Sequence, residues 1–275
     1  MIRKETLHAL EFNKILNVIS RFSHSDITQK SVLALCPHYE KDTIETRFGQ
    51  TREIQRLSQE GSPLKLSHFQ DISGLIEKVK PEGAVLEPGE LASFIPVLRI
   101  MHDISVQIKH NNTVPLLQEL TAILTGFPEM HDIMERSLDS EGKILDTASS
   151  ALAYFRRQIS NLDRKIQKRL EEILRDKRVI SFLQDTFVTK RTGRWVIPVR
   201  MDSKGQVSGV VHDVSRSGET AFLEPLEIIG LSNELENLSA EEKAEEMRIL
   251  RDICKRIRKT VKELYEQYEK SHIAL

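Results

Sequence analysis

The sequence predicts a mainly α-helical protein in which a long antiparallel coiled-coil arm carries a small four-stranded antiparallel sheet at its tip. Apolar residues recur at helical spacing through the first half of the chain. Two later segments show heptad spacing, and a stretch of short β-branched runs separates them. We therefore expect four parts, which are a helical core domain over 1–145, an outgoing arm helix over 146–183, the sheet over 184–225 and a returning arm helix over 226–275.

The composition fits long solvated helices and excludes several classes of protein. The 275 residues are 39% hydrophobic, 29% charged and 5% aromatic, and the formal net charge is -1. A near-neutral chain has no overall field that attracts nucleic acid, so such binding needs a local basic patch. The two cysteines, Cys36 and Cys254, form no CxxC pair, so we expect no zinc site and no disulfide. We find no signal peptide and no run of about 20 apolar residues, and expect a cytoplasmic protein without a membrane segment.

Short helices are predicted throughout the first half of the chain. Apolar stripes at helical spacing cover 7–19 and 26–35, and Asp42 is placed to cap a helix that ends at Gly61. Proline, glycine and asparagine punctuate the rest. The further predicted helices lie around 71–80, 87–110, 114–125 and 128–137.

Two heptad seams predict the arm. The first seam comprises Ala148, Leu152, Phe155, Ile159, Leu162, Ile166 and Ile173, and Arg169 interrupts it. The second comprises Met247, Leu250, Cys254, Ile257, Val261, Leu264 and Tyr268. Helices of some 30 residues would give an arm of roughly 45 Å. An alternative remains open, in which both helices lie flat on the helical domain. The narrow apolar stripe favours the arm, because a helix buried on a domain usually needs a wider one.

Four short runs between the seams predict the sheet. β-Branched and aromatic residues dominate 186–191, 194–199, 206–213 and 220–225, and the segments between them contain glycine for tight turns. Pro198 falls within the second run, which indicates an edge or a bulge at that point.

The stretch GVVHDVSRSGETAFLEP, residues 209–225, raises the question of a hydrolase site. Side chains of adjacent strand residues point to opposite faces, so His212 and Asp213 are not expected to pair. Ser215, Ser217 and Gly218 are the residue types that a turn requires. The chain also lacks a Gly-x-Ser-x-Gly elbow, a P-loop and an H-E-x-x-H motif. We therefore predict a turn and no catalytic residues. The charged run SAEEKAEEM, residues 239–247, is predicted to be a solvated helix face.

Basic residues in the turns of the sheet are the candidates for binding. Lysine and arginine held in turns can contact phosphates, and such binding depends strongly on salt. The alternative is ordinary solvation of hairpin tips. Trp195 could stack on a ligand or anchor the sheet, and we favour the anchor. The candidate contacts are Lys190, Arg191, Arg194, Arg200, Lys204 and Arg216.

Several of these segments resemble the MutS family, and more narrowly its second bacterial branch, the endonuclease MutS type. The resemblance is carried by LQDTFVTKRTGRWVIPVR, GVVHDVSRSGETAFLEP and LSNELENLSAEE, together with ILDTASSALAYFRRQI and LHALEFNKIL near the start. It extends over nearly the whole chain. It implies a split helical core domain and a helical lever, with a DNA clamp inserted between the lever helices where the sheet is predicted.

The resemblance assigns two groups of residues within the clamp. The six turn-borne cations given above would contact DNA. The residues that would shape the clamp are Gly193, Pro198, His212, Asp213, Ser217, Gly218, Glu224 and Pro225.

The resemblance also implies a function. It implies sequence-independent binding of duplex or branched DNA, coupled to ATP, and suppression of homologous recombination. The ATPase domain, with ATP, magnesium and homodimerisation, and usually a nuclease domain, would lie beyond residue 275, so we expect no enzyme activity, cofactor or metal in this chain. Two alternatives stay open, which are binding to a ribosome or rRNA and a purely structural coiled coil.

Overall fold

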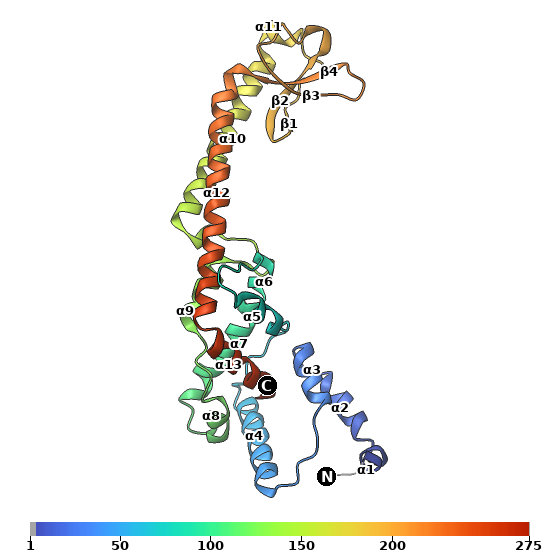
Figure 1. Ribbon diagram of the computed structural model, residues 1–275, viewed down its shortest axis with the longest axis vertical. Helices are drawn as coiled ribbons and strands as arrows, with labels where there is room; N and C mark the ends of the chain where they lie inside the picture. The colour runs from blue at the N-terminus through green and yellow to red at the C-terminus, as the bar shows by residue number, and fades with distance from the viewer. Residues whose placement is uncertain (1–3, 275) are drawn as a thin grey trace. The chain divides into compact units, whose positions relative to one another are not determined.

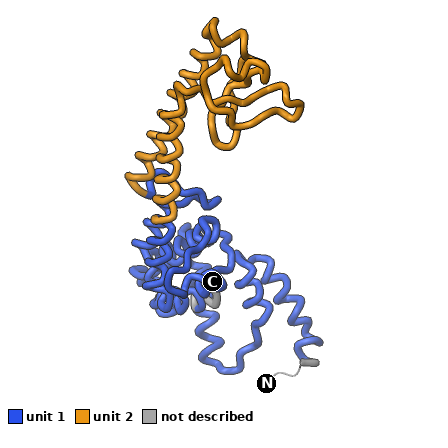
Figure 2. Tube along the Cα trace, turned by 45° about the horizontal axis from the view of Figure 1, so that its top comes forward, with its two compact units in different colours: residues 1–148, 249–275 blue, residues 149–248 orange. Residues whose placement is uncertain are grey.

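The computed structural model describes residues 4–274, and the side chains of 6–269 (Figure 1). The chain forms two compact units, each of which is described by itself (Figure 2). Unit 1 comprises residues 1–148 and 249–275, and unit 2 comprises residues 149–248. The predicted core domain over 1–145 thus gains the last part of the chain.

Unit 1 is helical, and its helices lie close to the predicted ranges. Proline occupies the first position of three of them, where its missing N–H costs no hydrogen bond. The helices are α1 Lys4–Ala9, α2 Phe12–Ser20, α3 Asp26–Leu33, α4 Lys41–Gln59, α5 Ser73–Val79, α6 Pro88–Ala92, α7 Phe94–Lys109, α8 Pro115–Thr121, α9 Pro128–Ser137 and α13 Val261–Ala274, with a short 3₁₀ turn at Asp146–Ala148.

Helix α7 forms the centre of the core of unit 1. Its residues Phe94, Leu98, Met101 and Ile104 are almost completely buried. The segment Pro88–Lys109 is by length and composition apolar enough to cross a membrane, contrary to our expectation that no such run exists. Because much of this apolar surface is buried inside the protein, its place in a core accounts for the composition.

The C-terminal residues pack into unit 1. The predicted returning helix over 226–275 is observed as α12, Leu226–Lys259, followed by α13. The Arg258 guanidinium donates to the carbonyl oxygens of Val79 at 3.0 Å and Ala84 at 2.7 Å. From Leu250 onward, the second predicted seam therefore packs inside unit 1 and not against the first seam. Its buried residues are Leu250, Cys254, Ile257, Leu264 and Tyr268. A heptad stripe indicates that a helix has an apolar partner but does not identify it.

Tyr268 on α13 ties the chain terminus to the core of unit 1. Its hydroxyl donates to Asp71 Oδ1 at 2.9 Å and accepts the backbone N–H of Ile72 at 3.2 Å. Burial raises the pKa of the Tyr268 hydroxyl, so it stays protonated and able to donate.

Replacing Tyr268 by phenylalanine is expected to destabilise the chain by about 1–3 kcal/mol, because the buried N–H of Ile72 loses its acceptor. Urea unfolding followed by circular dichroism would measure the loss. Tyr265→Phe on the same helix is the matched control, since the Tyr265 ring is partly exposed. Equal midpoints for the two variants would contradict the assigned role.

Unit 2 begins with an antiparallel pair of helices. Helix α10, Ser150–Arg175, packs along the part of α12 up to residue 248, and we call these two segments the helix pair. The buried stripe on α10 includes Leu162, Ile166 and Ile173 of the first predicted seam. Its partners on α12 are Ile228, Leu231, Leu235 and Leu238, which alternate spacings of three and four. The first seam is therefore a contact surface, with a partner that the sequence analysis did not identify.

The charged run 239–247 also contacts α10, contrary to the prediction of a solvated face. The Arg156 guanidinium lies 2.8 Å from both Glu242 Oε1 and Glu246 Oε1. Glu245 is 8% exposed and accepts a hydrogen bond from Ser149 Oγ at 2.6 Å. Ion pairs thus accompany the buried Leu152 at this end of the helix pair.

Replacing Arg156 by alanine is expected to cost about 1–2 kcal/mol, because two partly buried carboxylates lose one shared cation. The neighbouring Arg157 is exposed, so Arg157→Ala is the matched control with an expected change within about 0.5 kcal/mol. Thermal unfolding of both variants would measure the difference. A larger loss for Arg157→Ala would contradict the pairing.

The predicted four-stranded antiparallel sheet is observed in unit 2. Its strands are β1 Thr189–Arg191, β2 Arg194–Arg200, β3 Gly209–Val214 and β4 Thr220–Pro225, in the order β1-β2-β4-β3. A short helix α11, Lys177–Ile180, precedes β1, and a 3₁₀ turn, Met201–Ser203, follows β2. The buried residues Ile197, Val199 and Leu223 join the core of the helix pair, so sheet and helices share one core.

Pro198 lies on the part of β2 that extends past β1. Residues 189–191 of β1 pair only as far as Val196, and beyond that point the Pro198 carbonyl accepts the backbone N–H of Gln184 at 2.9 Å. The N–H that proline lacks is therefore not needed by β1. At this point β2 is flanked by β4 on one side and by residues 182–184, which bridge Val199, on the other, and its register with β4 is regular, so the predicted edge or bulge at Pro198 is wrong.

Candidate nucleic-acid interface on the sheet

The β1–β2 hairpin places two of the six candidate cations beside a tight turn. Arg191 pairs with Arg194, and the two residues between them, Thr192 and Gly193, have φ of 48° and 82°. Two successive left-handed residues define a type I′ turn, which fits the twist of the strands. Gly193 thus shapes the hairpin, as the sequence predicts.

Lys190 and Trp195 hold this hairpin against α10. Lys190 Nζ lies 3.0 Å from Asp163 Oδ1 and 4.5 Å from the centre of the Trp195 ring. The Trp195 indole N–H donates to the same Asp163 oxygen at 2.8 Å. Trp195 therefore anchors the sheet, and part of the Lys190 charge is neutralised by Asp163.

Arg194 is engaged with α12. Its Nη1 donates to Asn233 Oδ1 at 2.8 Å, and its Nη2 forms an ion pair with Glu236. Nη1 also lies 3.7 Å from Oε1 of Glu224. Because the Arg194 side chain is only 22% exposed, its main role in this geometry is to hold the sheet on the helix pair.

A buried carboxylate lies at the centre of the sheet. Glu224 on β4 is 2% exposed, and its Oε2 lies 2.7 Å from His212 Nε2. The register of β3 against β4 shifts between Val211 and Asp213, so His212 is the extra residue of a β-bulge. His212 on one side and Arg194 on the other thus compensate the Glu224 carboxylate.

The β3–β4 connection has the chemistry of a turn. Gly218, with φ of 75°, donates its N–H to the Ser215 carbonyl at 2.9 Å. Ser215 Oγ lies 3.2 Å from Ser217 Oγ and accepts the backbone N–H of Thr220 at 3.1 Å. His212 bonds Glu224 and not a serine, so the stretch forms no nucleophile–base pair within the described side chains. Pro225 ends β4 opposite Gly209.

Within the described side chains, four of the six candidate cations form no ion pair with the helix pair; Arg200, Lys204 and Arg216 are exposed, and the Arg191 side chain is 41% exposed. Arg191 lies 3.5 Å from Asp213 and over the Phe222 ring, and Arg200 lies 3.7 Å from Asp202. Lys204 and Arg216 have no ion-pair partner among the described residues. We call Arg191, Arg200, Lys204 and Arg216 the exposed tip cations.

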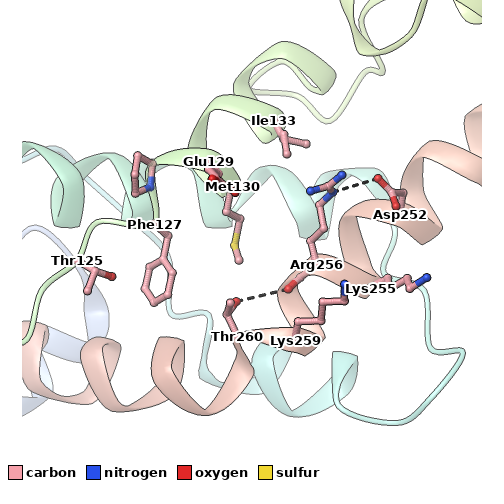
Figure 3. Close-up of a pocket in the computed structure, with 11 residues that line it drawn as sticks. Thr125, Phe127, Glu129, Met130, Ile133, Asp252, Lys255, Arg256, Lys259 and Thr260 are labelled. Carbon is pink, nitrogen blue, oxygen red and sulfur yellow. Dashed lines mark hydrogen bonds and ion pairs between the residues drawn. The ribbon is translucent and has the colours of Figure 1, made fainter.

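Unit 1 contains a separate groove between α9 and the end of α12 (Figure 3). Its volume is about 560 Å³, with Phe127 and Met130 on one side and Lys255 and Lys259 on the other. The groove brings no nucleophile beside a base. Over residues 4–274, no group of three or more His, Cys, Asp or Glu is placed to hold a metal ion.

The fold and the site define a class of protein. A helical unit is joined through one long helix to a unit in which a helix pair and a small sheet share a core, and cations lie on the turns of that sheet. This class has an exposed cationic surface and, in the described part of the chain, no assembled catalytic group.

The most informative similarities are to proteins named Endonuclease MutS2. The chain is 31% identical over 269 residues to that of Thermomicrobium roseum, which covers 96% of this chain and 34% of the relative. It is 31% identical over 247 residues to that of Symbiobacterium thermophilum, with 90% and 31% covered, and 29% identical over 269 residues to that of Aquifex aeolicus, with 98% and 35% covered. The chain thus spans about a third of the length of these curated relatives. No family model matches the chain.

Proposed function

We propose that this chain belongs to the MutS2 branch of the MutS family and forms its DNA-binding lever and clamp together with part of the core domain. The observation that carries the proposal is the similarity to Endonuclease MutS2 proteins over nearly the whole chain. The sheet, with its exposed tip cations, supports the assignment of unit 2 residues 184–225 as the clamp.

In this proposal the clamp binds the sugar–phosphate backbone of duplex or branched DNA. Arg200, Lys204 and Arg216 lie on exposed turns or strand ends, where a flexible cation can reach a phosphate. Phosphate contacts fix the position of a protein on DNA but read no sequence. Binding would therefore be sequence-independent and would weaken as salt is raised.

The activity of the whole protein is a further part of the proposal. The printed name of the relatives describes an endonuclease, and this chain spans about a third of their length. We place ATP and magnesium binding, homodimerisation and nuclease activity in other parts of such a protein. The role of this chain is then to engage DNA, and the cellular outcome is suppression of homologous recombination. Pure chain is expected to show neither ATPase nor nuclease activity.

A binding comparison tests the proposal. Fluorescence anisotropy of this chain with a linear duplex, a four-way junction and duplex RNA, each at 50 and 200 mM salt, is expected to show DNA binding that weakens steeply with salt. Ribosomes added as competitor are expected not to displace the DNA. Absence of DNA binding at 50 mM salt, or tighter binding to ribosomes than to either DNA, would overturn it.

A further inference from the structure

The outer face of α10 carries a line of cations that the sheet does not include. Arg157, Arg164, Lys168 and Arg175 are all exposed. Their spacings of seven, four and seven residues place them within about 40° of one another around the helix. This direction is opposite to the buried face that packs in the helix pair. We call these four residues the basic stripe.

The charge of the basic stripe is of one sign. A solvated helix face commonly mixes acidic and basic residues, and like charges four residues apart destabilise a helix by about 0.2–0.5 kcal/mol. On this face Asn161 lies between Arg157 and Arg164, and Arg164 donates to its side-chain oxygen, whereas the nearby Asp163 is bound by Lys190 and Trp195. Among the described side chains, the acidic partner of the stripe is Glu171, 4.0 Å from Arg175. Of the acids of 239–247, Glu242 and Glu246 are paired with Arg156 and Glu245 is buried.

A groove beside the stripe supplies a second, independent observation. It has a volume of about 330 Å³ and lies between α10 and the start of α12. Lys165, Lys168 and Arg169 line it. Arg169 is held by Glu172 and Glu227, whereas Lys165 and Lys168 have no ion-pair partner among the side chains of 6–269. Two uncompensated ammonium groups beside a groove suit a phosphate oxygen.

We propose that the basic stripe is a second nucleic-acid surface, which extends phosphate contacts from the sheet along α10. This inference rests on the proposed DNA binding, because the stripe would hold the same duplex. The stripe runs over 19 residues of helix, from 157 to 175, and its ends are about 27 Å apart, which is the length of about eight base pairs. An acidic protein fits less well, because protein interfaces usually have an apolar or aromatic centre. The exposed neighbours along the middle of the stripe, which include Asn161, Lys165 and Glu171, are polar or charged, and the exposed Tyr154 lies beyond its first residue.

Paired substitutions test the stripe. Arg164→Gln with Lys168→Gln removes two of its cations and keeps helix propensity. We expect the slope of log affinity against log salt to fall by about 1.8 units, and affinity for a 30-base-pair duplex at 0.15 M salt to fall about 10–30-fold. The matched control is Arg52→Gln with Lys65→Gln, two exposed cations of unit 1, with an expected change below about twofold. Unchanged urea midpoints would establish that both variants fold.

Each outcome decides between the two proposals. If the unaltered chain binds duplex and the exposed tip cations are needed, but the stripe variant binds with the same slope, the stripe proposal is wrong and the proposed function stands. If the unaltered chain binds no duplex, both fail. Stripe-dependent binding to polyglutamate, with duplex binding unaffected, would instead assign the stripe to an acidic protein. A photo-crosslinker attached to the thiol of a Lys168→Cys variant, with Cys36→Ser to remove the exposed native thiol, should crosslink to the duplex.

Discussion

Replacing Glu224 by alanine is expected to destabilise unit 2 by about 3–5 kcal/mol, enough to unfold a marginally stable domain. Glu224 is 2% exposed and lies 2.7 Å from His212 and 3.7 Å from Arg194. Removing the carboxylate leaves the bulged His212 without its partner and deprives the partly buried Arg194 guanidinium of its buried carboxylate neighbour, so that Glu236 alone pairs with it. Urea unfolding monitored by Trp195 fluorescence would measure the change in unit 2.

Two further variants make this prediction specific. Glu219→Ala removes an exposed acid from the turn that precedes the same strand, and is expected to change stability by less than about 0.5 kcal/mol. Glu224→Gln keeps a side-chain oxygen for His212, so its loss should be smaller than that of Glu224→Ala. The role assigned to Glu224 would be rejected if the Glu219 and Glu224 alanine variants unfolded at the same urea concentration.

Replacing the four exposed tip cations by glutamine is expected to weaken duplex binding about 100–1,000-fold at 0.15 M salt. Each lost phosphate contact removes about 0.9 from the slope of log affinity against log salt, so the four together remove about 3.6. Anisotropy titrations at several salt concentrations would measure both quantities. Arg200, Lys204 and Arg216 are exposed and Arg191 lies half-buried over the Phe222 ring, so the free energy of unfolding should fall by no more than about 1 kcal/mol.

Lys190 and Arg194 provide the contrast for this second prediction. Each is held by a carboxylate of the helix pair, Asp163 or Glu236. Their replacement by glutamine is expected to lower the urea midpoint of unit 2 and to leave the salt slope nearly unchanged. Suppose that Lys190→Gln with Arg194→Gln abolished the dependence of affinity on salt, and that the tip variant did not. The DNA contact would then lie on the β1–β2 hairpin and not on the exposed tip cations.

The features that the sequence predicted correctly are those encoded by neighbouring residues. The four strands follow from short runs of β-branched and aromatic residues, and the turn at Gly193 follows from the backbone freedom of glycine. The turn at Ser215–Gly218 follows in the same way from its serine and glycine content. Each of these features is decided within about ten residues.

The features that the sequence did not reveal depend on residues far apart. The apolar stripe that packs against α10 runs from Ile228 to Leu238. The charged run that follows Leu238 interrupts the heptad spacing, so this stripe is too short to be recognised from the sequence. The contacts of Asp163 with Lys190 and Trp195 join residues 27 and 32 positions apart. No local spacing identifies such pairs, so the distinction between anchored and exposed cations required coordinates. Whether those cations bind DNA stays a prediction.

The bulge at His212 has a consequence for how copies of this chain behave beside one another. β3 is an outer strand, and its Val210, Val211 and Val214 are exposed, which is the pattern that invites another chain to add a strand. The extra residue breaks the regular row of free backbone groups, and the Asp213 carboxylate lies next to the break. A variant that straightened this strand would be prone to edge-to-edge aggregation.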